Sequence, residues 1–234
     1  MTPTRLLFAE DAYRKAAPAV VMEVTEEGGL ILDACLFYAR GGGQPGDSGR
    51  ITWRGGRLDV ATAVRGTDGS IVAVPAAAGG LPSPGTTVDQ HLDWDRRYGH
   101  MRVHTALHLL SVVLAYPVTG GAIAADRGRL DFAMPDAPPA KDDIAAELNA
   151  LIARDLPITE EWIEEAEFDA NPGLVKTMSV APPRGRGPIR LIAIGDGADR
   201  VDLQPCGGTH VARTGEIGPV TVTKTENKGR QNRR

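Results

Sequence analysis

The sequence is poor in cysteine and in aromatic residues: it has two cysteines, Cys35 and Cys206, and aromatic side chains make up 5% of its 234 residues. Two cysteines so far apart give no disulfide framework, which excludes a small disulfide-stapled fold and suits a reducing compartment. No stretch approaches the roughly 20 consecutive apolar residues of a membrane-spanning helix, and the N-terminus lacks the basic-then-apolar pattern of a secretory signal. We therefore expect a cytoplasmic protein without a membrane partner.

The chain also lacks an excess of positive charge, because 26 Lys and Arg against 30 Asp and Glu give a formal net charge of −4. This balance argues against indiscriminate binding to nucleic acid, and we expect no DNA partner. Two local basic clusters could still form a patch, although a solvated tail is an equally good interpretation of the second. The clusters are Arg184, Arg186 and Arg190, and then Lys224, Lys228, Arg230, Arg233 and Arg234.

The first part of the chain, residues 1–92, has the pattern of a small antiparallel β-barrel. Short stretches that alternate apolar and polar residues are separated by Gly-Gly and Asp-Gly pairs, which favour tight hairpin turns. A chain of this length with 42% hydrophobic residues can bury one large core or two smaller ones, and we expect two domains. The predicted strands are residues 19–24, 29–34, 49–53, 57–64, 70–74 and 88–94.

The periodicity changes after residue 92, and residues 93–234 are predicted to form a second domain. Apolar residues at helical spacing predict a helix over 95–114 that ends before Pro117, and another over 142–154 that Pro157 stops. Alternating stretches at 158–163, 189–194, 201–203 and 217–223 predict strands. The fold class is therefore α+β, with the barrel followed by an antiparallel sheet packed with helices.

Four of the seven histidines and cysteines fall into two spaced pairs, His104 with His108 and Cys206 with His210. On a helix, His104 and His108 lie one turn apart on the same face, and the Gly-rich turn after Cys206 can bring a thiolate and an imidazole together. Zn²⁺ accepts such a mixed set in tetrahedral geometry, so we expect one zinc ion per chain. The alternative is a buried core thiol at Cys206 and a histidine at a strand end. His100 lies about 12 Å along the helix from His108, too far to share the ion, and is expected outside the ligand set or on the surface.

Three segments carry a family resemblance. Residues 94–110, WDRRYGHMRVHTALHLL, and residues 202–210, DLQPCGGTH, resemble the editing domain shared by alanyl- and threonyl-tRNA synthetases. The loop 41–49, GGGQPGDSG, resembles the Gly-rich motif of the alanyl branch. In this order and over nearly the whole chain, the sequence resembles the AlaX family of free-standing alanyl-tRNA editing proteins in its medium-length form. No class II synthetase core is recognised before the editing region, so we do not expect the chain to charge tRNA.

The resemblance implies a zinc-dependent aminoacyl-tRNA deacylase, a carboxylic ester hydrolase that removes serine, and as a second error glycine, from the acceptor end of tRNA(Ala). A pocket built for alanine rejects serine or glycine by only about 1–3 kcal/mol, so a second sieve is needed. An HExxH protease is excluded because Thr105 stands where that motif has its glutamate. The non-enzymatic alternative is a zinc-stabilised tRNA-binding module, which a deacylation measurement would distinguish.

The resemblance also implies the site residues. Gln44 and Cys206 are predicted to be catalytic, and Gly43, Gln44, Thr105 and Thr119 to contact the substrate. Gly43 lets the backbone approach closely, and the Gln44 amide both donates and accepts hydrogen bonds, although a plain hairpin turn is the alternative. Thr119 is a candidate to bind the serine hydroxyl, with an ordinary turn threonine as its alternative. Whether zinc orients the ester while water attacks, or activates a bound water, stays open.

Overall fold

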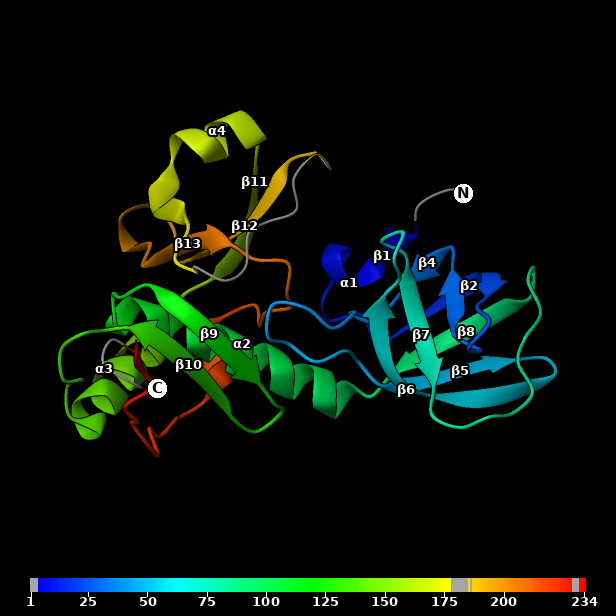
Figure 1. Cartoon of the computed structure of the whole chain (residues 1–234), viewed down its shortest axis with the longest axis horizontal. Helices are drawn as coiled ribbons and strands as arrows, with labels where there is room; N and C mark the ends of the chain where they lie inside the picture. Colours follow the sequence, from blue (N-terminus) through cyan, green and yellow to red (C-terminus); the bar gives the residue numbers. More distant parts are fainter. Residues whose placement is uncertain (1–3, 178–184, 186, 229–231) are drawn as a thin grey trace. The chain divides into compact units, whose positions relative to one another are not determined.

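The structure is a computed structural model, and it describes residues 4–177, 185, 187–228 and 232–234. The chain divides into two compact units, Met1–His100 and Met101–Arg234, shown in Figure 1. This division falls inside a helix, whereas the predicted boundary at residues 92 and 93 follows the last barrel strand. None of the helices in the described ranges is both long enough and apolar enough to cross a membrane.

The first unit contains the predicted antiparallel barrel, which is closed in the strand order β2-β3-β7-β6-β5-β8. Beside it, α1 (Leu7–Glu10) follows β1 (Arg5–Leu6), which pairs in parallel with β4 (Ala34–Cys35). Each predicted strand has a counterpart, but the last strand ends at Leu92 because Trp94 already begins a helix. The barrel strands are β2 (Ala16–Val24), β3 (Leu30–Leu32), β5 (Gly49–Trp53), β6 (Gly56–Arg65), β7 (Ile71–Pro75) and β8 (Thr87–Leu92).

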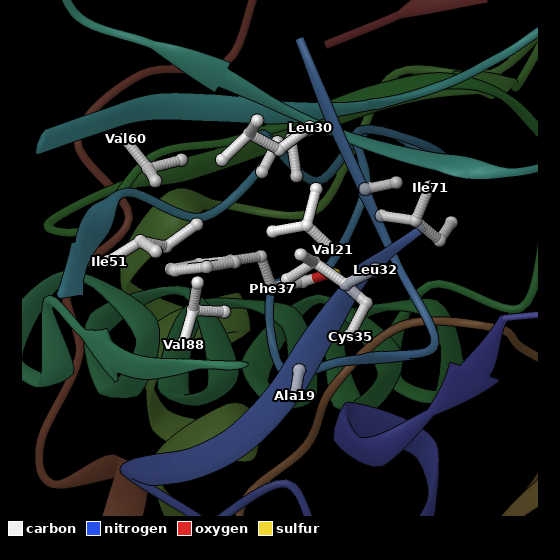
Figure 2. Packing of buried hydrophobic residues seen from close by; sticks show 13 residues of the cluster. Ala19, Val21, Leu30, Leu32, Cys35, Phe37, Ile51, Val60, Ile71 and Val88 are labelled. Atoms are coloured by element: carbon white, nitrogen blue, oxygen red, sulfur yellow. The ribbon is translucent and has the colours of Figure 1, made fainter. Parts of the chain in front are cut away.

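Alternation along these strands places one set of side chains inside the barrel. Figure 2 shows this core, with the aromatic ring of Phe37 among the aliphatic side chains. Phe37, Leu30 and Ile51 are 0% exposed. Each such side chain contributes roughly 1.5–3 kcal/mol by leaving water, so the barrel has its own stabilising core. The labelled core residues are Ala19, Val21, Leu30, Leu32, Cys35, Phe37, Ile51, Val60, Ile71 and Val88.

The second unit combines helices with two antiparallel three-stranded sheets, so the α+β prediction is confirmed. Helix α2 (Trp94–Val113) begins in the first unit and continues into the second. The sheets have the orders β14-β10-β9 and β11-β12-β13. The other elements are β9 (Val118–Ile123), β10 (Gly128–Ala133), α3 (Lys141–Ala153), β11 (Ile158–Ile163), α4 (Glu165–Ala170), η1 (Pro172–Leu174), β12 (Ile189–Ile194), η2 (Gly197–Asp199), β13 (Asp202–Pro205), η3 (Thr214–Ile217) and β14 (Asn232–Arg233).

One predicted strand, residues 217–223, is wrong. Ile217 ends the 3₁₀ helix η3, and Gly218 follows with a positive φ of 71°. Pro219 has no N–H to donate to a strand partner. Beyond it, the side-chain amide of Asn149 takes the place of a neighbouring strand, donating to the carbonyl of Val220 at 2.8 Å and accepting from its N–H at 2.9 Å. The alternation of apolar and polar residues over 217–223 is therefore not accompanied by the hydrogen bonds of a β-sheet.

The sequence did not predict the hairpin β9–β10. Its strands contain Gly120, Gly121 and Gly128, and glycine weakens a strand pattern. The structure gives a reason for one of them, because a Cβ on Gly128 would lie 2.6 Å from Cγ1 of Val103 in α2. The hairpin can pack this closely on the helix only with glycine at that position.

Candidate metal centre

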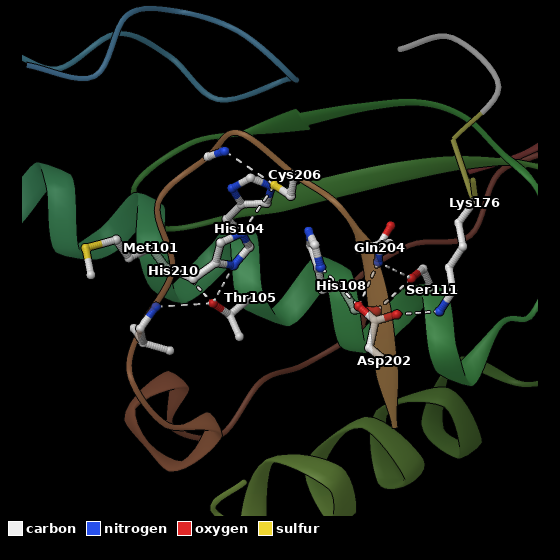
Figure 3. A network of polar contacts seen from close by, with 12 residues as sticks. Met101, His104, Thr105, His108, Ser111, Lys176, Asp202, Gln204, Cys206 and His210 are labelled. Carbon is white, nitrogen blue, oxygen red and sulfur yellow. Dashed lines mark hydrogen bonds and ion pairs between the residues drawn. The ribbon is translucent and has the colours of Figure 1, made fainter. Parts of the chain in front are cut away.

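Helix α2 presents His104 and His108 on one face, one turn apart. Both residues are largely buried, with 7% exposure each. The 20-residue helix is long enough to fix their relative position through its own hydrogen bonds, independently of any ion. The helix therefore supplies two imidazoles that are already oriented toward the same space (Figure 3).

The other pair comes from the turn that follows β13. Arg190, on the neighbouring strand β12, donates through Nη1 to the carbonyl of Cys206 at 2.8 Å and to that of Gly208 at 3.0 Å. The N–H of Gly208 points at the Cys206 sulfur, at 3.4 Å. The turn is thus held by a guanidinium from the adjacent strand, and it carries His210 back toward Cys206.

The four side chains form one compact group of donors. Cys206 Sγ lies 3.5 Å from His104 Nε2 and 3.3 Å from His210 Nε2, and the four ligand atoms all lie within 4.8 Å of one another. Tetrahedral zinc with bonds of about 2.0–2.3 Å separates its ligand atoms by roughly 3.3–3.8 Å. His104, His108, Cys206 and His210 could therefore hold a metal ion, and the two distances from Cys206 Sγ match this separation.

The proton of His210 can be assigned from its surroundings. Thr105 Oγ1 donates its single proton to the carbonyl of Met101 at 2.9 Å and accepts from the N–H of Val211 at 3.3 Å. The contact of 3.1 Å with His210 Nδ1 must then have the ring as its donor. His210 therefore carries its proton on Nδ1 and offers the lone pair of Nε2 to the group.

The ring of His108 is oriented by a hydrogen bond from its Nδ1, as that of His210 is, but here the acceptor is a carboxylate. Its Nδ1 lies 3.1 Å from Oδ2 of Asp202, a buried residue of β13. Because an ionised carboxylate accepts only, Nδ1 is the donor and Nε2 faces the other donors. Both histidines thus present Nε2, in the arrangement in which metal-bound imidazoles are usually held by an outer partner.

Burial and neighbouring charges oppose one another at this site. Burial alone would raise the pKa of the Cys206 thiol, but the charges of His104 and His210 pull that pKa well below its usual range. Burial would also lower the pKa of His108, but its hydrogen bonds to Asp202 and Cys206 raise the pKa to about 9. For His210, burial and the charge of His104 lower the pKa to about 3. The free site therefore favours a thiolate, and an incoming metal must displace a proton from His108.

The Gly-rich loop of the first unit forms a two-residue hairpin turn. Gly41 and Gln44 exchange backbone hydrogen bonds at 3.1 Å and 2.9 Å, and Gly42 and Gly43 between them have φ of 55° and 82°. Positive φ at both central positions is the type I′ geometry that glycine adopts without strain. Gln44 is completely buried. The predicted roles of Gly43 and Gln44 toward a substrate stay predictions.

The other residues singled out in the sequence are Thr105, Thr119 and His100, and the structure shows how far each is buried and what it contacts. Thr105 is completely buried, and its hydroxyl makes the contacts with Met101, His210 and Val211 described above. Thr119 lies in strand β9 and is half-buried, so it is not a turn residue. His100 is outside the ligand group, as expected, but it is buried rather than on the surface, with 1% exposure.

The sequence did not identify three residues that support this site. Arg190 was assigned to a basic cluster, whereas in the structure it braces the Cys206 turn and pairs with Glu160. Asp202 is the first residue of the motif at 202–210, four residues before Cys206. On a strand, Asp202 and Gln204 lie on the same face, and an acid at that position was the signal that could have identified it. No signal distinguished Lys176, which reaches Asp202 from a distant segment. The other two members of the predicted cluster, Arg184 and Arg186, lie outside the described residues, as does Arg230.

Family models match both parts of the chain. Residues 189–234 match the threonyl and alanyl tRNA synthetase second additional domain, and residues 11–96 match class II (A) tRNA synthetases. The first match contains Cys206 and His210, and the second covers the six barrel strands and the turn before Gln44.

The sequence is also similar to two groups of curated proteins. Over 99% of its length it is 32% identical to the alanyl-tRNA editing protein AlaX-M of Methanosarcina barkeri and 30% identical to that of Methanosarcina acetivorans, and it covers 97% of each. Over 95% of its length it is 36% identical to the alanine–tRNA ligase of Pyrobaculum calidifontis. The chain spans 25% of that ligase, so the similarity there is to one part of a much longer protein.

Proposed function

The chain belongs to the AlaX-M family of alanyl-tRNA editing proteins, and from this we propose that it hydrolyses the ester that joins a wrong amino acid to tRNA(Ala). The proposed substrates are seryl-tRNA(Ala) first and glycyl-tRNA(Ala) second, with free amino acid and tRNA as products. The observation that carries the proposal is the close group of three imidazoles and one thiolate, within 4.8 Å of one another, in a chain of this family.

We propose zinc as the ion. The donor set of three nitrogens and one sulfur is within the normal range of Zn²⁺, and thiolate ligation argues against the hard cations Mg²⁺ and Ca²⁺. His104, His108, Cys206 and His210 would hold it. When bound, zinc supplies a positive charge that orients or polarises the aminoacyl ester.

The chain's own residues would supply recognition. We assign Gln44 and Gly43 to contact with the aminoacyl-adenosine, because a buried amide both donates and accepts and the neighbouring glycine leaves space for a ligand. We assign Thr119 to the hydroxyl of serine. Alanine would leave such a polar group unpaired at a cost of about 1–3 kcal/mol, which would favour release of serine over alanine. Thr105 would contact the substrate beside the metal ligands, and Cys206 would take part in catalysis as a ligand at the reacting centre.

The test is release of amino acid from seryl-, glycyl- and alanyl-tRNA(Ala) under one set of conditions. We expect serine to be released much faster than alanine, and we expect salt to weaken the reaction because phosphate contacts contribute to tRNA binding. His104→Ala should abolish the activity, whereas His91→Ala, which changes an exposed histidine of the barrel, should retain it. Binding of tRNA without release of serine would instead identify a non-catalytic, metal-stabilised binding module.

A further inference from the structure

Asp202 connects the metal-ligand group to a second layer of polar residues. Its side chain is 0% exposed, and both of its oxygens are occupied. Oδ2 accepts from His108 Nδ1 at 3.1 Å and from Gln204 Nε2 at 2.8 Å, while Oδ1 accepts from Lys176 Nζ. Figure 3 shows these donors converging on the carboxylate from three directions. A carboxylate so fully bonded has little freedom to rotate.

The same network attaches Asp202 to helix α2 at a second point. Gln204 Nε2 also lies 3.3 Å from the hydroxyl oxygen of Ser111, and that hydroxyl donates to the carbonyl of His108 at 2.7 Å. The ring of His108 is therefore bonded to Asp202 directly, and its backbone is bonded to the same strand through two side chains. This double attachment fixes how β13, which leads into Cys206, faces the helix.

Lys176 balances the charge of this buried carboxylate. An uncompensated carboxylate in the interior is strongly destabilised, and it is tolerated when it is paired and hydrogen-bonded. Lys176 lies after η1, and its carbonyl accepts from the N–H of Val118 at 2.8 Å, at the start of β9. Its side chain is 28% exposed, so the ammonium group reaches inward from a partly covered position.

We propose that Asp202 is a positioning residue of the metal centre, which holds the ring of His108 with Nε2 toward the other donors, and that Lys176 acts through Asp202. The inference rests on the proposed metal site. An outer carboxylate both fixes the orientation of a ligating imidazole and raises its basicity, and loss of such a partner weakens metal binding by about 10–100-fold. In the corresponding place, Nδ1 of His210 contacts the neutral hydroxyl of Thr105, so of these two contacts the one at His108 is the charged one.

The direct test measures metal affinity rather than activity. Metal-free wild type, Asp202→Asn and Asp202→Ala are titrated with Zn²⁺ against a chromogenic chelator, and with Co²⁺ while the visible absorption of the bound ion is recorded. We expect Asp202→Ala to bind Zn²⁺ about 10–100-fold more weakly and to change the Co²⁺ spectrum. Asp202→Asn keeps an acceptor oxygen without the charge, and it should lie between wild type and alanine.

The matched control is Asp131→Asn, which removes an acid of the same unit that pairs with Arg234. Its metal affinity and Co²⁺ spectrum should equal those of the wild type. If the Asp202 variants bind Zn²⁺ as tightly as wild type and only the melting temperature of the metal-free protein falls, Asp202 is merely a core ion pair and the inference is overturned.

Lys176 is tested by a double-mutant cycle. Lys176→Met should weaken Zn²⁺ binding less than Asp202→Ala does, and it should have no further effect once Asp202→Asn is present, because the charge it balances has gone. Independent, additive losses would overturn the role assigned to Lys176. A wild type that binds Zn²⁺ but releases no serine would refute the proposed function and leave this inference standing, whereas a wild type that binds neither metal would overturn the inference itself.

Discussion

The guanidinium of Arg97 and the carboxylate of Asp47 form an ion pair that is closed to solvent, with side-chain exposures of 0% and 1%. Arg97 Nε lies 2.9 Å from Oδ2 of Asp47, and the same oxygen accepts from the N–H of Tyr38 at 2.6 Å. Asp47 follows Gln44 by three residues, and Arg97 lies in the first turns of α2. This pair therefore anchors the Gly-rich loop to the first turn of α2, within the first unit.

The first prediction is that Asp47→Ala destabilises the protein severely. It leaves the guanidinium of Arg97 buried without its counter-charge, which costs about 3–5 kcal/mol of unfolding free energy. Urea denaturation measures the loss. Asp59→Ala is the control, because it breaks an exposed pair with Arg50, whose side chain is 51% exposed, and should cost no more than about 1 kcal/mol. Equal small losses in both variants would contradict the structural role of the buried pair.

The second prediction concerns metal content. Cys206→Ala and His210→Ala each remove one of the four donors, and both should purify with much less zinc than the wild type, in which we expect about one ion per chain. Elemental analysis of protein dialysed against metal-free buffer measures this. His100→Ala, which changes a buried histidine outside the group, should keep its zinc. Equal metal loss in the His100 variant would mean that the ligand set is wrong.

The third prediction is that metal-free protein gains stability as the pH rises to about 6.5, and that its stability then stays level to about pH 8.5. Burial and the charge of His104 lower the folded-state pKa of His210 to about 3, so between pH 3 and 6.5 the unfolded chain binds the extra proton and stability rises with pH. For His108, burial is outweighed by hydrogen bonds to Asp202 and Cys206, and the pKa is about 9. Between pH 6.5 and 8.5 the folded state holds this extra proton, which alone would make stability fall as pH rises. The Cys206 thiol opposes the fall, because its pKa in the folded state is well below its usual range and the unfolded chain keeps the thiol proton up to about pH 8.5.

Chemical denaturation of metal-stripped protein across this range measures the effect, with slopes of up to about 1.4 kcal/mol per pH unit for each histidine. His108→Gln removes the opposing proton of His108, so its stability should go on rising from pH 6.5 to about 8.5, while the rise below pH 6.5 remains. If the stability of His108→Gln stayed as level as that of the wild type from pH 6.5 to about 8.5, the assignment to His108 would be refuted.

The sequence predicted the parts of this protein that depend on local periodicity. Two examples are the helical spacing of His104 and His108 and the alternation predicted for β11 and β12. Both are properties of residues close together in the sequence, so the local pattern is enough to predict the element. The contact of Lys176 with Asp202 depends on two segments meeting in the tertiary fold, and no local pattern encodes it. The wrong strand at 217–223 has the same cause, because the side chain of Asn149, distant in sequence, binds the backbone that a strand would have paired.

The last prediction tests whether the Gly-rich loop takes part in the proposed deacylation. Gln44→Ala should lower kcat/KM for seryl-tRNA(Ala) by about 5- to 150-fold, which corresponds to roughly 1–3 kcal/mol for one buried hydrogen bond to the substrate or transition state. Zinc content should stay at the wild-type value, because Gln44 is not among the four donors. Gly42→Ala provides the comparison: it strains a backbone held at a φ of 55° and should lower the melting temperature as well as the activity. If Gln44→Ala instead melts early and keeps its activity at low temperature, the loop is a structural hairpin and recognition of the aminoacyl group lies elsewhere.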